Sequence, residues 1–340
     1  MYSPDGTHRA ILETKPLMAF DENKDFATQQ AALKQKLTEL LGKTPETVPP
    51  SPVIEETVEH ETYTEYRIRF DVEARVQAIC LLCIPHVAKG ERVPLVICLQ
   101  GHGRGMHVSM GRRAYECEKP DDGDRDIALQ ALKRGYAALS LDQRGMGERR
   151  TVLGGNPNDS GAPRCHVTAM NALMVGRTMI GERCHDVSCA IDLALTFEQI
   201  DPDRIICTGN SGGGTTTFYA ACMDERIKVA MPSCAVCTYK HSIGAMNHCV
   251  CNFIPNVALY ADMGDLAALI APRKLVIIHG KDDPIFPDEG VRETYETVEK
   301  IYAAAGVPEN CALATGGGGH RYYEAEAWDG FDRVGGFDFE

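Results

Sequence analysis

Apolar and polar positions along the chain follow two periods, which predict strands and helices in turn. Residues 61–73 alternate between apolar and polar, as in a half-buried strand, and 76–84 form a second strand pattern close behind. Residues 93–99 are a continuous apolar run, typical of a strand covered on both faces. Later patterns predict strands at 136–141, 204–208, 229–231, 274–279 and 311–313, and helices at 124–134, 177–197, 215–221 and 289–305. This alternation predicts a mostly parallel, doubly wound sheet of eight strands, opened by an antiparallel hairpin.

The first 57 residues predict an arm packed on a main domain that spans 58–340. The arm contains one helical pattern, 24–41, which ends before Gly42 and is followed by a proline-rich extended stretch. Residues 233–263 lie between two core strands and contain no strand pattern of their own. We expect them to form a lid-like insertion at the edge of the sheet.

A predicted strand ends abruptly in the segment Gly209-Asn210-Ser211-Gly212-Gly213, and a helix follows it. A strand that stops at a serine between glycines, with a helix directly after it, has the pattern of a nucleophile elbow. Gly209 and Gly213 fit, because a Cβ at either position would collide with neighbouring backbone in so sharp a turn. Ser211 is therefore the candidate nucleophile.

A serine nucleophile needs a base, and the base needs an acid to orient it. On a parallel sheet these groups come from loops at the carboxyl ends of strands. Asp282 and Asp283 follow the strand 274–279, and His320 follows the strand 311–313 through a glycine loop. His320 is the predicted base. Either aspartate fits the acid, and the other then caps the helix that begins nearby.

The order Ser, Asp, His along the chain is that of the α/β-hydrolases. Residues 277–287 resemble the acid loop of that family, which implies that Asp283 is the acid. Residues 142–148, 176–183 and 248–255 resemble bacterial acetyl-xylan-esterase-like α/β-hydrolases, often grouped with dienelactone hydrolases. Dienelactone hydrolases have a cysteine nucleophile where this chain has Ser211. The resemblance thus implies hydrolysis of small acyl esters, such as acetate on a sugar or a xylan fragment, through an acyl-enzyme.

Two backbone N–H groups should stabilise the oxyanion of such a reaction. One is expected from Gly212, at the start of the predicted helix. The resemblance implies the second from His102, with Gly103 as the alternative, because Gln100 stands where the family often has histidine. The substrate pocket is predicted to include Gln100, Gly103, Arg104, Asn210, His248 and Cys249. The long loop 144–177, with Arg149, Arg150, Arg164 and His166, is the other candidate wall.

The densest group of cysteines and histidines along the chain is formed by Cys234, Cys237, His241, His248, Cys249 and Cys251. A zinc site is conceivable there, because these residue types bind zinc. However, Cys234 and Cys237 lie at a predicted strand end, and the remaining spacings fit no structural zinc pattern. We therefore expect no metal and no cofactor.

The chain is acidic, with 35 Lys and Arg against 48 Asp and Glu and a formal net charge of -13. This balance argues against nucleic acid or an anionic membrane as the main partner. No apolar run reaches a membrane-spanning length, and the first residues lack a signal-peptide pattern. The 14 cysteines are expected to be reduced and mostly buried. We therefore expect a cytoplasmic protein that acts on a small-molecule or oligosaccharide ester.

Two other functions are compatible with parts of the pattern. Peptidases related to prolyl oligopeptidase share the Gly-x-Ser-x-Gly-Gly signature, although an arm of about 60 residues is too short for the β-propeller that usually precedes their catalytic domain. A non-catalytic binding protein on the same fold is the alternative from another class. The presence of Ser211, Asp283 and His320 together argues against it.

Overall fold

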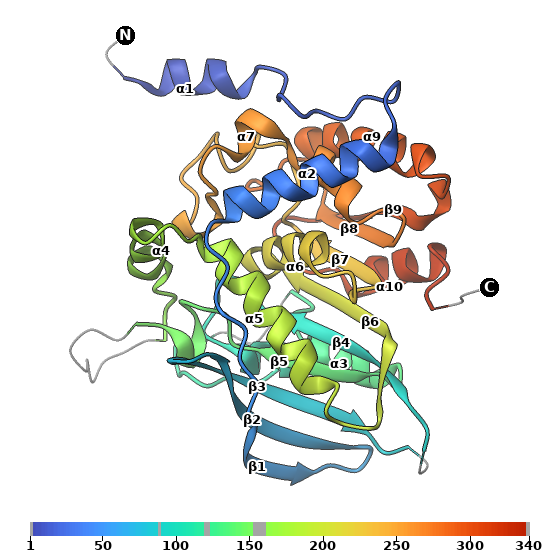
Figure 1. Ribbon diagram of the computed structural model, residues 1–340. Helices are drawn as coiled ribbons and strands as arrows, with labels where there is room; N and C mark the ends of the chain where they lie inside the picture. Colours follow the sequence, from blue (N-terminus) through green and yellow to red (C-terminus); the bar gives the residue numbers. More distant parts are fainter. Residues whose placement is uncertain (1–2, 88–89, 119–122, 152–160, 338–340) are drawn as a thin grey trace.

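The computed structural model describes residues 3–87, 90–118, 123–151 and 161–337 (Figure 1). Within these residues the strands form a single sheet of nine, in the order β1-β2-β3-β5-β4-β6-β7-β8-β9. The strands are β1 (Val53–Glu59), β2 (Tyr63–Glu73), β3 (Val76–Pro85), β4 (Val93–Leu99), β5 (Ala137–Leu141), β6 (Ile200–Asn210), β7 (Val229–Ser233), β8 (Lys274–Gly280) and β9 (Cys311–Gly316). Pairing is antiparallel from β1 to β5 and parallel from β5 to β9. The predicted hairpin and parallel sheet are confirmed.

The expected number of eight strands is wrong, because β1 was not recognised. All of its residues are exposed, so burial imposes no apolar period on its sequence. Its neighbour is β2, and Val53 lies opposite Arg69 at one end of the pair. The strand also crosses the predicted boundary between residues 57 and 58, so the end of the arm is part of the sheet.

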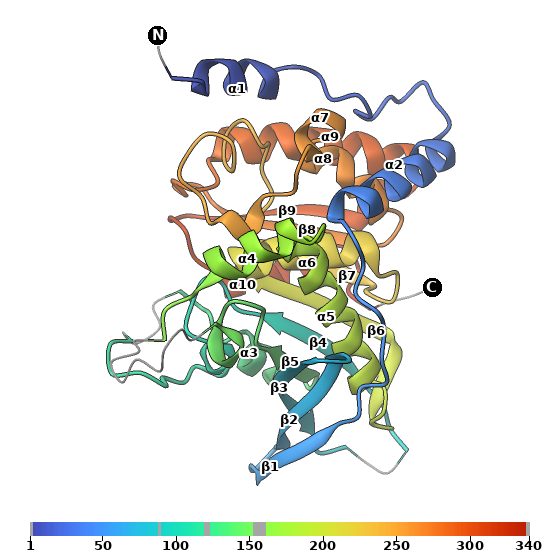
Figure 2. The ribbon, with the colours of Figure 1, turned by 60° about the vertical axis from the view of Figure 1, so that its left-hand side comes forward.

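Helices cover both faces of the sheet, as expected for a doubly wound fold (Figures 1 and 2). One face is covered by α5 (Met179–Ala194), α6 (Gly212–Met223) and α9 (Asp288–Ala304), which share one apolar core. The other face is covered by α3 (Ile127–Lys133) and α10 (Glu324–Arg333), which share a second core. The sequence patterns predicted all of these helices except α10.

The arm holds α1 (Asp5–Leu12) and α2 (Phe26–Leu41), of which only α2 was predicted. The buried residues Leu33, Leu37 and Leu41 hold α2 against the first core. At Gly42 the backbone has a φ of +86°, and a Cβ there would lie 2.4 Å from the carbonyl oxygen of Gly176. This close approach ties the end of α2 to the start of α5.

Two long connections lie at the carboxyl edge of the sheet. The loop between β5 and α5 contains η2 (Gly147–Arg149) and α4 (Cys165–Met174), and its residues 152–160 lie outside the described part of the chain. The connection between β7 and β8 contains η3 (Val250–Asn252), α7 (Val257–Tyr260), α8 (Met263–Leu266) and η4 (Ala267–Leu269). It includes the predicted insertion 233–263, and its described residues add no strand to the sheet. Two further short helices are η1 (Met106–Met110), after β4, and η5 (Pro308–Asn310), before β9.

Candidate active site

Ser211 lies at the sharp turn between β6 and α6. Its φ is 56° and its ψ is -121°, a conformation that residues with a side chain rarely adopt. The turn is fixed from outside, since the N–H of Ser211 donates to the carbonyl of Ser233 at 2.8 Å. A Cβ on Gly209 or Gly213 would lie 2.4 or 2.0 Å from the carbonyl oxygen of Leu99. The structure therefore has the geometry of a nucleophile elbow.

His320 and Asp283 come together from the loops after β9 and β8. The Nδ1 atom of His320 lies 2.7 Å from Oδ2 of Asp283. The other carboxylate oxygen of Asp283 accepts hydrogen bonds from the N–H groups of Ile285 and Phe286, at 2.8 and 3.2 Å. The Phe286 ring also stacks on the His320 imidazole at an interplanar angle of 15°. These contacts fix the imidazole against Asp283.

Burial alone would raise the pKa of Asp283, but the hydrogen bonds from His320 and from the two N–H groups hold it below its usual value. A carboxylate that stays ionised can hold the N–H of an imidazole and stabilise the imidazolium form. The neighbouring Asp282 is exposed, and its own N–H donates to the carbonyl of Gly318. The geometry thus favours Asp283 over Asp282 as the acid.

A cavity of about 840 Å³ opens beside Ser211 and His320. The predicted pocket residues all line it: Gln100, Gly103, Arg104, Asn210, His248 and Cys249. So do His102 and the insertion residues Met246 and Asn247. Residues of the segment 233–263 therefore form part of the cavity wall.

For the other predicted wall, the loop 144–177, none of the described residues lines the cavity, and residues 152–160 of that loop lie outside the described part of the chain. Its basic side chains are held elsewhere. Arg144 and Arg149 form ion pairs with the buried carboxylate of Asp186, at 2.8 and 2.6 Å. Arg164 and His166 do not line the cavity either, and Arg150 donates to the hydroxyl of Tyr115.

Instead, the later part of the segment between β4 and α3, from Val108 onward, supplies a wall that the sequence reasoning missed. Its cavity-lining residues are Val108, Gly111, Arg112, Arg113, Cys117, Glu118 and Arg125. The segment has no apolar period and no motif, so only its length could have drawn attention to it.

The loop after β4 passes against the elbow, where an oxyanion would form. A Cβ on Gly101 would lie 2.9 Å from the carbonyl oxygen of Asn210 and 3.2 Å from the Cβ of Ser211. The His102 ring lies over the start of α6, since a Cβ on Gly212 would be 2.6 Å from it. The N–H of Gly103 already donates to the carbonyl of Gly101 at 2.6 Å. This arrangement favours His102 over Gly103 as the second donor.

The carboxylate of Asp142 supports this loop from below. It accepts hydrogen bonds from the N–H groups of Met106 and Glu148, at 2.6 and 2.8 Å, and from the side-chain amide of Gln100 at 3.4 Å. A Cβ on Gly147 would lie only 2.1 Å from the same carboxylate. Burial raises the pKa of Asp142 to about 6, although the two backbone hydrogen bonds oppose the shift. Asp142 thereby links the loops after β4 and β5.

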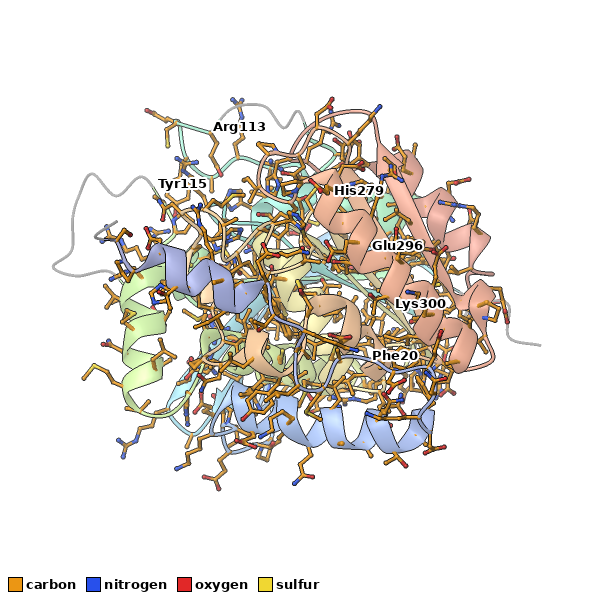
Figure 3. All side chains as sticks on the ribbon, turned by 90° about the horizontal axis from the view of Figure 1, so that it is seen from above. Phe20, Arg113, Tyr115, His279, Glu296 and Lys300 are labelled. Carbon is orange, nitrogen blue, oxygen red and sulfur yellow. The ribbon has the colours of Figure 1, made fainter. Side chains whose placement is uncertain are left out.

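Burial lowers the pKa of His248 to about 4, and the nearby His102 and His320 act in the same direction. His248 is therefore a neutral side chain in the cavity wall, and its Nδ1 lies 2.9 Å from the amide nitrogen of Asn252. His279, labelled in Figure 3, is 1% exposed and lies 3.0 Å from the hydroxyl of Thr315. This contact with Thr315 gives His279 a structural role at the end of β8.

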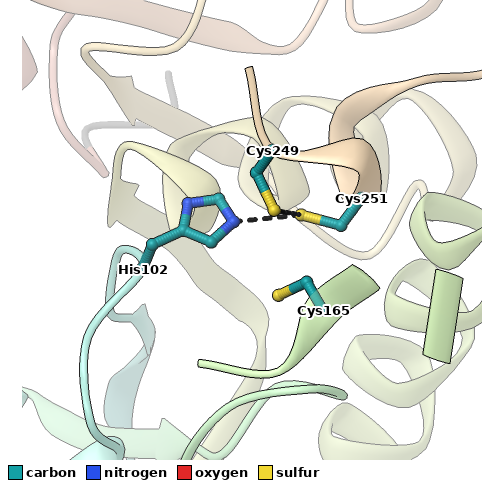
Figure 4. A group of neighbouring side chains, drawn as sticks. All are labelled: His102, Cys165, Cys249 and Cys251. Atoms are coloured by element: carbon teal, nitrogen blue, oxygen red, sulfur yellow. Dashed lines mark hydrogen bonds between the residues drawn. The ribbon is translucent and has the colours of Figure 1, made fainter. Parts of the chain in front are cut away.

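The cysteines and histidines that are close along the sequence separate in space. Cys234 lies beside Asp283 and His320, whereas Cys237 and His241 pack against Gly290. Cys249 and Cys251 instead meet two residues from distant parts of the chain, His102 and Cys165 (Figure 4). The sequence grouping missed this set because its members come from three different loops.

The sequence profile of the Abhydrolase family matches residues 2–327. A protein of Bacillus subtilis (strain 168), provisionally named hydrolase YtaP, is 26% identical over 298 residues, which are 86% of this chain and 94% of that protein. A Bacteroides fragilis structure, provisionally named an acetyl xylan esterase, superposes with a TM-score of 0.79 at 20% identity, covering 96% of this chain and 83% of that one. A glucuronoyl esterase from Solibacter usitatus superposes with a TM-score of 0.66 at 13% identity, covering 94% and 96%. These likenesses establish the α/β-hydrolase fold.

Among the described helices, none combines the length and the apolar composition that crossing a bilayer requires.

Proposed function

Because the chain belongs to the Abhydrolase family, we propose that it is a serine carboxylic-ester hydrolase that works through an acyl-enzyme. The observation that carries this proposal is the hydrogen bond between His320 and Asp283, at 2.7 Å. His320 and Ser211, at the elbow, both line the same cavity. A buried carboxylate, an imidazole and a serine in this arrangement are the parts of a Ser-His-Asp triad.

In the proposed reaction, Nε2 of His320 takes the proton from Oγ of Ser211 as this oxygen attacks the ester carbonyl carbon. Asp283 accepts the hydrogen bond from Nδ1–H and stabilises the imidazolium. The N–H groups of Gly212 and His102 stabilise the oxyanion. His320 then gives its proton to the departing alcohol, which leaves an acyl group on Ser211. A water molecule, deprotonated by His320, releases the acid and regenerates the serine.

We propose a carbohydrate ester with a small acyl group, such as acetate on a xylan fragment, as the substrate. The named activities of the similar structures, acetyl xylan esterase and glucuronoyl esterase, support an ester of a sugar. The cavity of about 840 Å³ lies within the size range of small-molecule sites. None of the fourteen cysteines forms a disulfide, which supports the proposal of a cytoplasmic enzyme.

The peptidase alternative has less support. The described residues of the arm form α1, α2 and the start of β1, and contain no four-stranded blade of a propeller. The binding-protein alternative leaves the His320–Asp283 pair without a role.

The test is turnover of p-nitrophenyl acetate by the wild-type protein and by Ser211→Ala. Ser140→Ala is a matched control, because Ser140 is a buried serine on β5 whose hydroxyl has no hydrogen-bond partner among the described residues. We expect turnover by the wild type and Ser140→Ala, and none above background by Ser211→Ala. Undiminished turnover by Ser211→Ala would disprove the mechanism. A panel of acetylated xylo-oligosaccharides and uronate esters then identifies the substrate, and inertness towards all esters would favour a binding protein.

A further inference from the structure

Four side chains from three connections at the carboxyl edge of the sheet point toward one another (Figure 4). They are His102, from the loop after β4, Cys165, the first residue of α4, and Cys249 and Cys251, which flank Val250 at η3. A ring nitrogen of His102 and the three sulfur atoms all lie within 4.8 Å of one another. The sulfur of Cys251 is central, at 3.0 Å from Nε2 of His102 and 3.2 Å from the sulfur of Cys249.

Two of the four side chains lie in an apolar core, and one buried positive charge lies beside them. Cys165 and Cys251 belong to a small core with Met146, Ala169 and Met179. The guanidinium of Arg183, 1% exposed, donates to the sulfurs of Cys251 and Cys165, both at 3.4 Å. Within the described part of the chain, Arg183 forms no ion pair with a carboxylate, and its remaining hydrogen bonds go to the carbonyl of Arg144. A buried cation without an acidic partner is costly unless negative charge lies beside it.

We propose that His102, Cys165, Cys249 and Cys251 bind one zinc ion in a tetrahedral site. Three thiolates and a neutral imidazole around Zn²⁺ carry a net charge of about -1, and the guanidinium of Arg183 balances it. Soft sulfur ligands in a four-coordinate arrangement favour zinc over the oxygen-seeking cations Mg²⁺ and Ca²⁺. This assignment replaces our expectation that the chain binds no metal.

The observed distances fit such a site with small movements. Zinc lies about 2.3 Å from sulfur and about 2.0 Å from nitrogen, so that two sulfurs of a tetrahedron are about 3.8 Å apart. The sulfurs of Cys249 and Cys251 are 3.2 Å apart, and the widest ligand separation is below 4.8 Å. Shifts of less than about 1 Å, within the reach of side-chain rotation, place all four ligands around one ion.

The protein fills all four positions of the proposed site, which is the pattern of structural rather than catalytic zinc. The ion would join the loop after β4, the start of α4 and the insertion after β7. The same loop carries the backbone of His102 past the elbow. The zinc ion would therefore hold the oxyanion loop and the cavity wall at Cys249 in place. No zinc-bound water takes part in the proposed ester hydrolysis.

The experiment measures metal by inductively coupled plasma mass spectrometry, in protein purified without an affinity tag and without chelators. We expect about one zinc per chain in the wild type. Cys249→Ser should lose the zinc, whereas Cys311→Ser should keep it. Both cysteines are half-buried, and Cys311 lies at the amino end of β9, away from the carboxyl edge of the sheet. The melting temperature should fall in Cys249→Ser, and removal of zinc from the wild type should lower it similarly.

Cobalt provides a readout that does not depend on the variants. Wild-type protein stripped of zinc and loaded with Co²⁺ should show the intense visible bands of a tetrahedral ion and the near-ultraviolet bands of thiolate-to-cobalt charge transfer. Absence of zinc together with absence of these bands would overturn the proposal. So would full zinc retention in a folded Cys249→Ser, or a disulfide between Cys249 and Cys251 in the native protein. Metal content is measured without any ester, so the zinc site and the esterase proposal can fail separately.

Discussion

Two groups of side chains near the elbow, called here the His320 side and the cysteine side, are built in different ways. On one side, Asp283 and His320 lie a few residues beyond the ends of β8 and β9. On the other, Cys165, Cys249 and Cys251 lie deep within the long connections after β5 and β7. The sheet itself therefore positions the proposed acid and base, whereas the cysteine side depends on how three connections pack on one another. One edge of a sheet can thus combine side chains positioned by strand ends with side chains that need an additional constraint, here the proposed zinc ion.

The largest expected effect comes from Ser211→Ala, which removes the proposed nucleophile. We expect kcat to fall by about 10⁶-fold, as when the serine of a triad is removed. The cysteine side should be untouched, with zinc content equal to that of the wild type. A large loss of zinc in this variant would show that the two sides are not independent.

A smaller loss is expected for Asp283→Asn, which leaves the imidazole without its orienting carboxylate. The comparable change in a serine protease lowers kcat by about 10⁴-fold, because the imidazole takes the wrong tautomer. Asp282→Asn is the matched control, since Asp282 is exposed and makes its hydrogen bond to Gly318 through the backbone. Steady-state kinetics on p-nitrophenyl acetate distinguish the two, and equal losses would contradict the assignment of Asp283.

Gly212→Ala tests the junction of the two sides. The added Cβ would lie 2.6 Å from the His102 ring, so the ring must move away from the start of α6. We expect kcat to fall by about 10²-fold, the loss typical of one oxyanion donor, together with weaker zinc binding. Gly317→Ala is the control, because no atom lies within 4 Å of its added Cβ. Loss of activity without weaker zinc binding would show that the displaced His102 ring keeps its place in the zinc site.

The smallest effect concerns Asp142, whose pKa of about 6 lies above the ordinary value. Between about pH 4 and pH 6 the folded protein then binds more protons at this residue than the unfolded chain does. Its contribution to the free energy of unfolding should therefore fall as the pH rises through this interval. Urea unfolding of the wild type and Asp142→Asn should show this component in the wild type only. Parallel pH profiles for the two proteins would contradict the raised pKa.

The sequence predicted most of the features that lie on the strands or directly at their ends. The run from β6 into Ser211 and Gly213 identified the elbow, because a buried strand followed by a glycine-rich turn leaves a clear local pattern in the sequence. His320 followed from its place after a strand. The residues alone left Asp282 and Asp283 equivalent, and the resemblance to the family's acid loop chose Asp283, which the hydrogen bond to His320 favours.

What the sequence did not predict depends on contacts between distant segments. His102 and Cys165 are far from Cys249 along the chain, so neighbourhood in sequence grouped Cys249 with Cys234 and Cys237 instead. The exposed strand β1 lacks a buried face and therefore lacks a period. The arginines of the loop 144–177 were expected in the cavity wall, but ion pairs to Asp186 draw Arg144 and Arg149 inward.

The left-handed backbone of Ser211 has a consequence for the evolution of stability in this protein. A side chain at a φ of 56° costs about 1–3 kcal/mol, which the hydrogen bond to Ser233 and the packing of β6 must offset. Glycine would remove the cost, because it adopts such backbone angles without strain. Selection for fold stability alone would therefore favour glycine at position 211, whereas selection for the proposed catalysis would retain the serine. The elbow is a position where a more stable protein and an active enzyme require different residues.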